Sequence, residues 1–351
     1  MTPRRFSNHD IHAEAMEIPM KPPRSRLSLL LAVTACVTAF DAAAVAQRTF
    51  VASYGLGANT AVNCSVFQPC RTFAEALSVT VPGGEIIVLD SAGYGAVTVT
   101  QPVTIHAPPG IYAGVSVFSG SGITVNAPGA KVTLRGLSIT GLGGATGVEL
   151  QAADTLFVDN VVLSGFSGAG AAGLRAAPAA AATLLVRDSQ LRDNATALAL
   201  ASAATLTASV ERTGFDRNAT AVAVTDNVQA EFDASSIAAG ANGLSVQPGG
   251  AATSRVQVRG TSFYGNSGNA VVVGGGASAN ASVSLVSSQL AANGTGLRVQ
   301  GGAAAYATDT TITRNATGVS TTGGATAVSA GDNRLLDNTT NGAFTSVQGK
   351  Q

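Results

Sequence analysis

Charged side chains that could do chemistry recur at regular intervals through the middle of this sequence. Six of them lie 22 to 28 residues apart: Arg135, Asp159, Arg187, Glu211, Asp233 and Arg259. Glu231 lies two residues before Asp233, so in an extended strand both side chains face the same side. Glu211, Glu231 and Asp233 form the only dense carboxylate cluster in the sequence, and Arg187 and Arg259 flank it.

This cluster has two interpretations. In the first, carboxylates bind a hard cation such as calcium and an arginine acts on a sugar-acid substrate, so these five residues are the catalytic candidates. In the second, the charges form an exposed ladder of ion pairs that keeps neighbouring repeats in register, and each pair contributes at most about 1 kcal/mol. We favour the ladder because the charges alternate almost perfectly in sign, and we assign no metal ligand.

Other polar groups offer less chemistry. His106, the one histidine after residue 46, has no obvious partner in the sequence. No histidine accompanies a recurrent hydroxyl column, so we predict a stacked ladder rather than a row of nucleophiles. This column contains Ser189, Thr213, Ser235, Thr261, Ser288 and Thr310. A further outward column has one acid, although glycosidases need two. Its members are Glu149, Arg175, Ala199, Ala223, Ser245, Val271, Arg298 and Ser320.

The elements that position these side chains are repeats of 22 to 28 residues, each with one large apolar anchor. The nine anchors are Ile139, Leu163, Leu191, Phe215, Ile237, Phe263, Leu290, Ile312 and Leu335. Apolar columns lie five residues upstream (Leu134 to Ala330) and seven upstream (Val132 to Val328), and polar residues lie between them. A period of two predicts strands with one buried face, and such repeats stack into a solenoid. Three short strands per repeat without a helix predict an all-β fold, a parallel β-helix.

A turn follows each anchor and usually contains asparagine, which tolerates left-handed backbone and bonds its own turn. Gly240 replaces it in one repeat. We predict a structural turn ladder of Asn194, Asn218, Asn266, Asn293, Asn315 and Asn338. All but Asn266 begin Asn-x-Thr strings that match glycosylation acceptors, but the recurring turn explains them without a glycan.

Residues 1–46 are predicted to be a signal peptide region, with Met16 and Met20 as alternative true starts. Basic residues precede the apolar run 27–40, which is too short for a membrane span, and Ala44-Val45-Ala46 offers a cleavage site. We therefore expect a secreted or periplasmic protein. A lipoprotein modified at Cys36 is the minority alternative.

Residues 47–84 are predicted to be an N-terminal cap. Export makes a disulfide between Cys64 and Cys70 plausible. Thr72 and Glu75 have the spacing of a capping box, and Pro82-Gly83-Gly84 should end the short helix, which should shield the first coil. Coils are expected over 85–345, the first of them with strands at 85–90, 96–100, 103–106, 114–118 and 122–126, and a C-terminal tail over 346–351.

Composition excludes some partners. The segment after residue 46 carries 15 Lys and Arg against 16 Asp and Glu. A nucleic-acid partner is not expected, because such proteins need a basic face. We also expect no transmembrane segment after the signal peptide.

The segment 48–109 resembles the N-terminal cap and first coil of right-handed parallel β-helix proteins of the pectin-lyase-like superfamily. The residues that carry the resemblance are the cysteine loop, 71–77 (RTFAEAL), 82–89 (PGGEIIVL) and 97–105 (VTVTQPVTI). Members with known activity use a calcium-binding acidic cluster with an arginine base, or grouped aspartates with a histidine. Neither motif is present as a contiguous string, so the resemblance implies the fold and not a reaction. The chain is more similar to secreted bacterial β-helix repeat proteins whose activity is generally unassigned.

Two functions follow as hypotheses. The first is an exported, non-catalytic β-helix that presents an extended surface to a polysaccharide or cell-envelope component, without a cofactor. The second is a carbohydrate-active enzyme, a polysaccharide lyase or glycoside hydrolase, that uses the Glu211, Glu231 and Asp233 cluster. Calcium would be a cofactor only in the second case.

Overall fold

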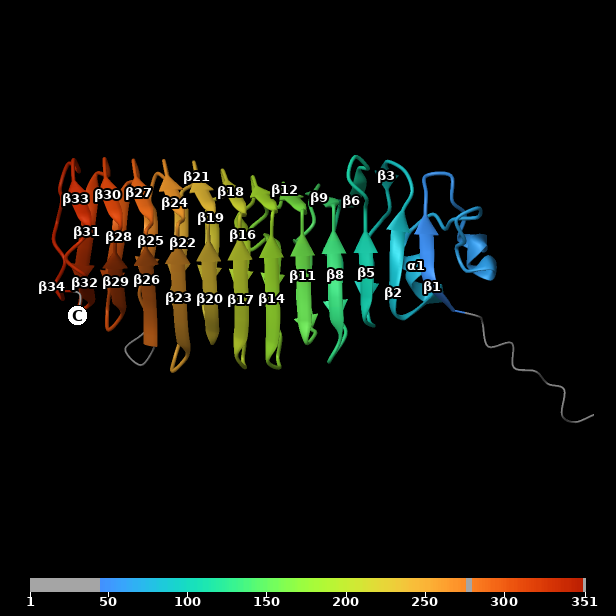
Figure 1. The fold of residues 1–351 in the computed structure, drawn as a ribbon, viewed down its shortest axis with the longest axis horizontal. Helices are drawn as coiled ribbons and strands as arrows, with labels where there is room; N and C mark the ends of the chain where they lie inside the picture. Colours follow the sequence, from blue (N-terminus) through green and yellow to red (C-terminus); the bar gives the residue numbers. More distant parts are fainter. Residues whose placement is uncertain (1–44, 276–279, 350–351) are drawn as a thin grey trace, which may run out of the picture. The chain divides into compact units, whose positions relative to one another are not determined.

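The computed structural model describes residues 45–275 and 280–349. The predicted signal peptide up to residue 44, its alternative starts and Cys36 lie outside these residues. Within the described part, three parallel sheets wind around one apolar interior. Figure 1 shows the coils following one another along the long axis, from β1 at the blue end to β34 at the red end. The predicted parallel β-helix is therefore confirmed.

Each coil contributes one strand to each of three sheets. Sheet 1 has 13 strands. In spatial order they are β1 (Ala46–Val51), β2 (Thr80–Val88), β5 (Val103–His106), β8 (Lys131–Arg135), β11 (Thr155–Asp159), β14 (Ala182–Arg187), β17 (Leu206–Glu211), β20 (Val228–Asp233), β23 (Thr253–Arg259), β26 (Asn280–Val286), β29 (Ala304–Thr308), β32 (Thr326–Ser329) and β34 (Ser346–Val347).

Sheet 2 follows sheet 1 along each coil and sheet 3 completes the turn. Sheet 2 consists of β3 (Ala92–Gly93), β6 (Ala113–Val117), β9 (Leu137–Gly141), β12 (Val162–Ser164), β15 (Gln190–Arg192), β18 (Gly214–Asp216), β21 (Ser236–Ala238), β24 (Ser262–Tyr264), β27 (Gln289–Ala291), β30 (Thr311–Thr313) and β33 (Arg334–Leu336). Sheet 3 consists of β4 (Val97–Val99), β7 (Ser121–Asn126), β10 (Thr146–Ala152), β13 (Ala172–Ala176), β16 (Thr196–Leu200), β19 (Thr220–Val224), β22 (Asn242–Val246), β25 (Asn269–Val273), β28 (Thr295–Gln300) and β31 (Thr317–Thr322).

The register of the strands places equivalent residues of successive repeats side by side. The anchors pair across sheet 2, as Leu163 does with Ile139 and with Leu191. In sheet 1 the charged column is also in register, with Asp159 opposite Arg135 and Arg187. Inward and outward residues alternate along these strands, so the interior is a continuous apolar stack. Neighbouring strands lie about 4.8 Å apart.

Three predicted positions are out of register because loop lengths vary between coils. In the last coil Ala305 pairs with Ala327 and Ala307 with Ser329, so the predicted members Val328 and Ala330 are each one residue too late. In sheet 3 Val272, and not Val271, lies opposite Ser245. Val271 points inward and is fully buried. Fixed offsets from the anchor fail where an extra residue lies between strands.

Asparagines stack inside the corner between sheets 2 and 3. The Asn194 side-chain amide donates to Oδ1 of Asn218 at 3.0 Å, and the amide of Asn266 donates likewise to Asn293 at 2.9 Å. The left-handed residue of this turn precedes the asparagine, for example Asp193 with φ 58°. The predicted reason for asparagine, its own left-handed backbone, is therefore wrong. Its side chain instead satisfies buried backbone groups of the neighbouring coil.

Gly240 interrupts this stack for a steric reason. A Cβ at this position would lie 2.3 Å from the backbone oxygen of Asn218. The backbone of the neighbouring coil therefore leaves no room for a side chain at this position. The Gly240 amide still donates to Oδ1 of Asn266 at 3.2 Å, which keeps one bond of the stack.

The N-terminal segment contains a strand that was not predicted. β1 pairs with β2 and is the first strand of sheet 1. Helix α1 (Phe73–Val79) follows the 3-10 helix η1 (Gly57–Val62), and Thr72 and Glu75 form a capping box at its start. The helix ends at Val79, and Pro82-Gly83-Gly84 lies inside β2 rather than stopping the helix. The helix was expected to shield the open edge of the first coil, but β1 covers the edge of β2. That α1 shields the end of the apolar interior stays a prediction.

Candidate functional site

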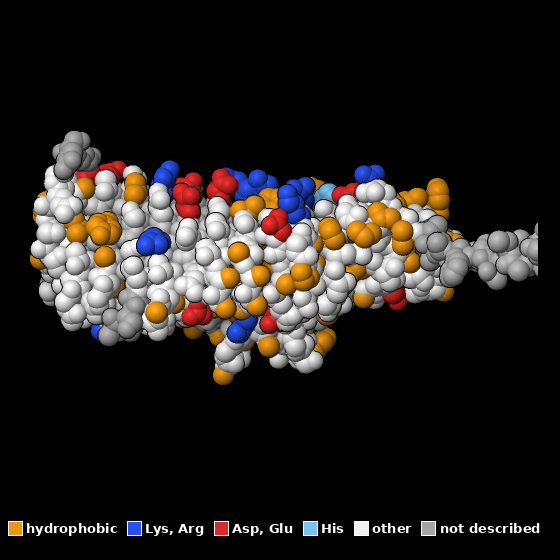
Figure 2. All heavy atoms as spheres, turned by 90° about the horizontal axis from the view of Figure 1, so that it is seen from below, with side chains coloured by type: hydrophobic (Ala, Val, Ile, Leu, Met, Phe, Trp, Pro, Cys, Tyr) orange, Lys and Arg blue, Asp and Glu red, His pale blue; other side chains and the backbone are white. Residues whose placement is uncertain are grey.

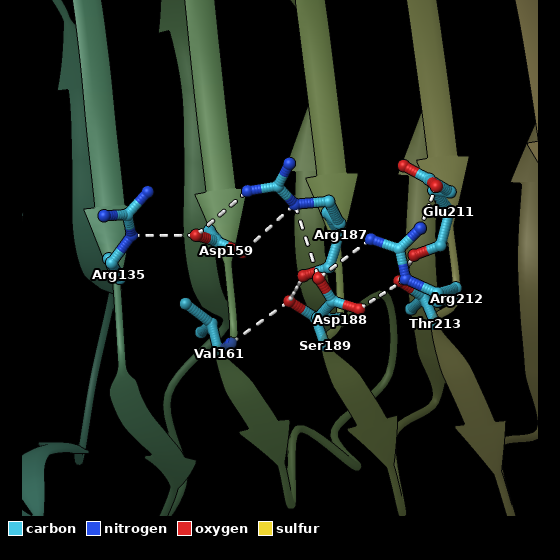
Figure 3. Close-up of polar contacts among 9 residues, drawn as sticks. All are labelled: Arg135, Asp159, Val161, Arg187, Asp188, Ser189, Glu211, Arg212 and Thr213. Atoms are coloured by element: carbon cyan, nitrogen blue, oxygen red, sulfur yellow. Dashed lines mark hydrogen bonds and ion pairs between the residues drawn. The ribbon is translucent and has the colours of Figure 1, made fainter. Parts of the chain in front are cut away.

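Ion pairs connect the charged column of sheet 1 along the solenoid axis (Figure 3). Nε of Arg135 lies 2.8 Å from Oδ2 of Asp159, and Nη2 of Arg187 lies 3.4 Å from the same oxygen. The guanidinium of Arg187 also lies 4.9 Å from the Phe157 ring centroid. The Asp159 side chain is only 11% exposed. Two arginines therefore neutralise one nearly buried carboxylate.

The network continues through the corner after each strand. Arg212 donates two hydrogen bonds to Asp188, at 2.7 and 3.0 Å, and it also contacts the Glu211 carboxylate (Figure 3). At the next corner Arg217 donates to Asp193 at 2.8 and 3.0 Å. These hydrogen bonds from Arg212 and Arg217 hold the pKa values of Asp188 and Asp193 below the usual range of a carboxyl group. We call the pairs from Arg135 to Arg217 the ion-pair ladder.

The predicted carboxylate cluster is only partly assembled. Glu211 and Asp233 lie opposite each other in neighbouring strands, but Glu231 lies opposite Ser209. Glu231 is 3.9 Å from Arg259, and Arg187 bonds Asp159 and Asp188 instead of Glu211. Within 45–275 and 280–349 no three acidic, histidine or cysteine side chains are grouped closely enough to hold a metal ion. The arrangement favours the ion-pair interpretation over a cation site.

The hydroxyl column binds backbone groups. Ser235 accepts a hydrogen bond from the amide of Thr213 at 3.2 Å and donates to the carbonyl of Asp233 at 2.9 Å. Its neighbours Ser189 and Thr261 follow the same pattern. These hydroxyls are occupied structurally, in agreement with the predicted stacked ladder.

Two other sequence signals have structural partners. Nδ1 of His106 lies 3.7 Å from Oε1 of Glu85, so the expectation that this histidine lacks a partner is wrong. Cys64 and Cys70 form a disulfide.

The asparagines of most Asn-x-Thr strings, for example Asn194 and Asn315, are buried and bonded inside the corner. A buried amide cannot carry a glycan in the folded chain.

A groove of about 420 Å³ lies on the outer face of sheet 1, across β17, β20, β23, β26 and β29. Most of the accessible surface of the groove is apolar, hydroxyl and amide side chains are the commonest polar groups in its lining, and the half-exposed ring of Tyr306 lies at one end. The polar lining residues are Thr207, Ser209, Gln229, Glu231, Arg255, Gln257, Ser282, Ser284 and Tyr306. Figure 2 shows that charged side chains gather in a band along one edge of the solenoid, whereas most of the face below it is uncharged.

Most polar side chains of the groove, unlike those of the ion-pair ladder, have no protein partner in the described part of the chain. Among the described residues, none of the hydroxyl or amide side chains of the groove has a hydrogen-bond partner, and Arg255 has no ion pair. Glu231 is the one carboxylate in the lining, and its contact with Arg259 is long, at 3.9 Å. The groove therefore offers unsatisfied donors and acceptors along about 19 Å, four strand spacings.

Sequence reasoning missed the groove. It considered the outward column four residues before the anchor, whereas the groove is formed by the columns six and eight residues before it. Ser209, Glu231, Gln257, Ser284 and Tyr306 occupy the first of these and lie opposite one another in register. A continuous run of polar residues ending in an aromatic was visible in the aligned repeats. Of the five catalytic candidates predicted from the sequence, only Glu231 lines the groove.

Comparison with known proteins agrees with this architecture. A family model described as right handed beta helix region matches residues 121–286. Among solved structures, the crystal structure of the pectate lyase Pel9A is similar with a TM-score of 0.49 and 12% identity over 81% of this chain and 74% of that chain. No curated protein matches the sequence. The coils and the family model confirm the predicted right-handed β-helix, and the solved structure contributes nothing about activity.

Membrane-spanning helices are absent from the part of the chain that the structure describes.

Proposed function

We propose that this right-handed parallel β-helix protein is exported and binds a carbohydrate chain without cleaving it. The binding surface is the groove on sheet 1, and the partner is a polysaccharide or another glycan of the cell envelope. Export rests on the predicted signal peptide.

The free hydrogen-bonding groups of the groove carry this proposal. Gln229, Gln257 and Ser284 project from successive strands and have no partner among the described residues. Sugars present many hydroxyls, which exchange hydrogen bonds with water for bonds to such fixed groups. Ligand sites combine a few placed polar groups with apolar and aromatic walls. Tyr306 supplies an apolar face against which the C–H groups of a sugar ring can pack.

The composition of the groove supports binding rather than cleavage. Glycoside hydrolysis uses two carboxyl groups that flank the scissile bond, and Glu231 is the single carboxylate in the lining. Glu211 contacts Arg212, and it is not part of the lining. Asp233 is also absent from the lining.

A polysaccharide binding screen tests the proposal. Neutral and acidic polysaccharides are offered to the purified protein with and without calcium, and both binding and the appearance of reducing ends are measured. We expect binding without depolymerisation. Replacing Tyr306 with Ala should weaken binding about tenfold, since lost ring contact of this kind is worth about 1 to 2 kcal/mol.

Tyr264→Ala is the matched control. Tyr264 is 53% exposed on sheet 2 and Tyr306 is 47% exposed on sheet 1, so the two variants lose similar side chains at different faces. Equal weakening by both variants, or no binding of any polysaccharide, would contradict the proposal. Depolymerisation that Glu231→Gln or Asp233→Asn abolishes would replace it with the enzyme hypothesis.

A further inference from the structure

A second surface of the protein lies in the loop between β1 and α1, well away from the groove. Residues 52–69, which we call the cap loop, contain no charged side chain. Five of its large apolar residues are nevertheless exposed, and the exposed fraction of Phe67 reaches 91%. The others are Tyr54, Leu56, Val62 and Val66. Single exposed apolar residues are ordinary, but such a concentration in 18 residues indicates an interaction surface.

The cap loop is held rigidly, so its apolar side chains cannot fold back onto the protein. Cys64 and Cys70 are fully buried and joined by a disulfide. The Phe50 amide donates to the Cys64 carbonyl at 2.8 Å, and the Cys70 amide donates to the Phe50 carbonyl at 2.9 Å. The loop is thereby bonded along β1, and the tip with Val66 and Phe67 projects from a fixed base.

Polar groups of the cap loop are bonded within the loop itself. The amides of Leu56 and Asn59 donate to the carbonyls of Pro69 and Leu56, and the amide of Cys64 donates to the carbonyl of Asn59. The Asn59 side chain donates to Pro69 at 2.6 Å, and the Thr60 hydroxyl donates to Gly57 at 3.0 Å. Backbone groups that enter a lipid environment must be satisfied internally. The base of the loop meets that requirement before any partner binds, whereas the backbone amides of Val66 and Phe67 at the tip would stay hydrated at headgroup level.

We propose that the cap loop inserts its apolar side chains into the interfacial region of a lipid bilayer. Phe67, Leu56 and the valines would enter the acyl boundary, and Tyr54 would lie at headgroup level, where tyrosines are enriched. A protein partner fits less well, because protein interfaces carry a polar, hydrogen-bonding rim. The cap loop has no charged residue for such a rim.

The location of the cap loop keeps this inference independent of carbohydrate binding. It lies at the β1 end of the solenoid in Figure 1, and the first groove strand, β17, is five strand positions beyond β2, or about 24 Å. A protein attached by the cap loop would keep the groove free for a second ligand.

Vesicle co-sedimentation of the purified protein tests the proposal. The probes are phosphatidylcholine vesicles with and without phosphatidylglycerol, each at low and high salt. We expect binding to both kinds, and little change with salt, because the inserted segment has no charge to be screened. Phe67→Ser should weaken binding roughly tenfold to a hundredfold, since burying a Phe side chain contributes about 1.5 to 3 kcal/mol.

Phe118→Ser is the matched control, since Phe118 is 70% exposed on a different loop, between β6 and β7. It should bind vesicles as the unchanged protein does, and both variants should keep the melting temperature. Absence of vesicle binding, or equal loss in both variants, would overturn the proposal. A dimer that Phe67→Ser dissociates, without vesicle binding, would assign the surface to a second copy instead. Polysaccharide binding should be unchanged in Phe67→Ser, so failure of either proposal is recognised separately.

Discussion

The ion-pair ladder starts in the column of sheet 1 next to the groove and continues through the corners, and its side chains differ from those of the groove in what they bind. Asp159 is shared by Arg135 and Arg187, and Asp188 is bonded twice by Arg212. In the groove, Gln257 and Ser284 have no partner among the described residues. Side chains that satisfy one another stabilise the register of the coils, whereas unsatisfied ones are available to a ligand. Charge density alone therefore does not identify the side chains that lack a protein partner.

The largest expected difference in unfolding free energy is between substitutions on the inward and outward faces of one groove strand. Val258 is fully buried in β23, and its neighbour Gln257 lines the groove. Val258→Asp should lower the free energy of unfolding by about 4 kcal/mol or more, because the carboxylate loses its hydration. Gln257→Asp should change it by less than about 0.5 kcal/mol. Urea unfolding followed by circular dichroism measures both, and equal costs would show that the inward and outward assignment is incorrect.

A smaller difference in unfolding free energy is expected between a substitution in the ladder and one in the groove. Asp159→Ala removes a nearly buried carboxylate from between two arginines, and we expect a loss of about 2 to 3 kcal/mol in unfolding free energy. Glu231→Ala removes a half-exposed carboxylate with one long contact, and we expect less than about 0.5 kcal/mol. The same urea titration compares them. If the two variants were equally stable, the ladder would have no structural role.

Acid should weaken the ladder and leave the groove unaffected. Hydrogen bonds from Arg212 and Arg217 lower the pKa values of Asp188 and Asp193 in the folded protein. The stabilisation is therefore present above the unfolded pKa of about 3.9 and is lost as pH falls through the folded pKa. The double variant Asp188→Asn and Asp193→Asn should show a shallower loss of melting temperature below about pH 4.

A groove variant without an ionisable group is the control for this pH dependence. Ser284→Ala should follow the profile of the unchanged protein at every pH, because it removes no titrating group and no described bond. An unaltered acid profile in the double variant would mean that Asp188 and Asp193 do not contribute to the acid sensitivity.

The smallest effect concerns the two acidic candidates outside the groove. Glu211→Gln and Asp233→Asn should change polysaccharide affinity by less than about twofold, since neither residue lines the groove. Titration of each variant with the best polysaccharide from the screen measures this. A tenfold loss in either one would extend the binding surface into the charged column.

The repeat, the strands and the inward or outward direction of most side chains were predictable from the order of the residues. A period of two leaves no alternative to a half-buried strand, and the spacing of the anchors requires stacked coils. The Cys64–Cys70 disulfide was likewise predicted correctly from export and cysteine number. These features depend on local patterns, which is why they can be read along the chain.

Which polar side chains have partners depends on the packing of neighbouring coils against one another. The pairing of Arg187 with Asp159 and Asp188, instead of Glu211, depends on rotamers and on strand spacing, which no linear pattern contains. One-residue changes in loop length also moved Val271 to the interior and placed Val272 opposite Ser245 in the outward column. The strand β1 and the exposed tip at Phe67 became visible only once the chain was folded. Local periodicity determines which face a residue occupies, but contacts between coils determine whether that residue is satisfied or free to bind.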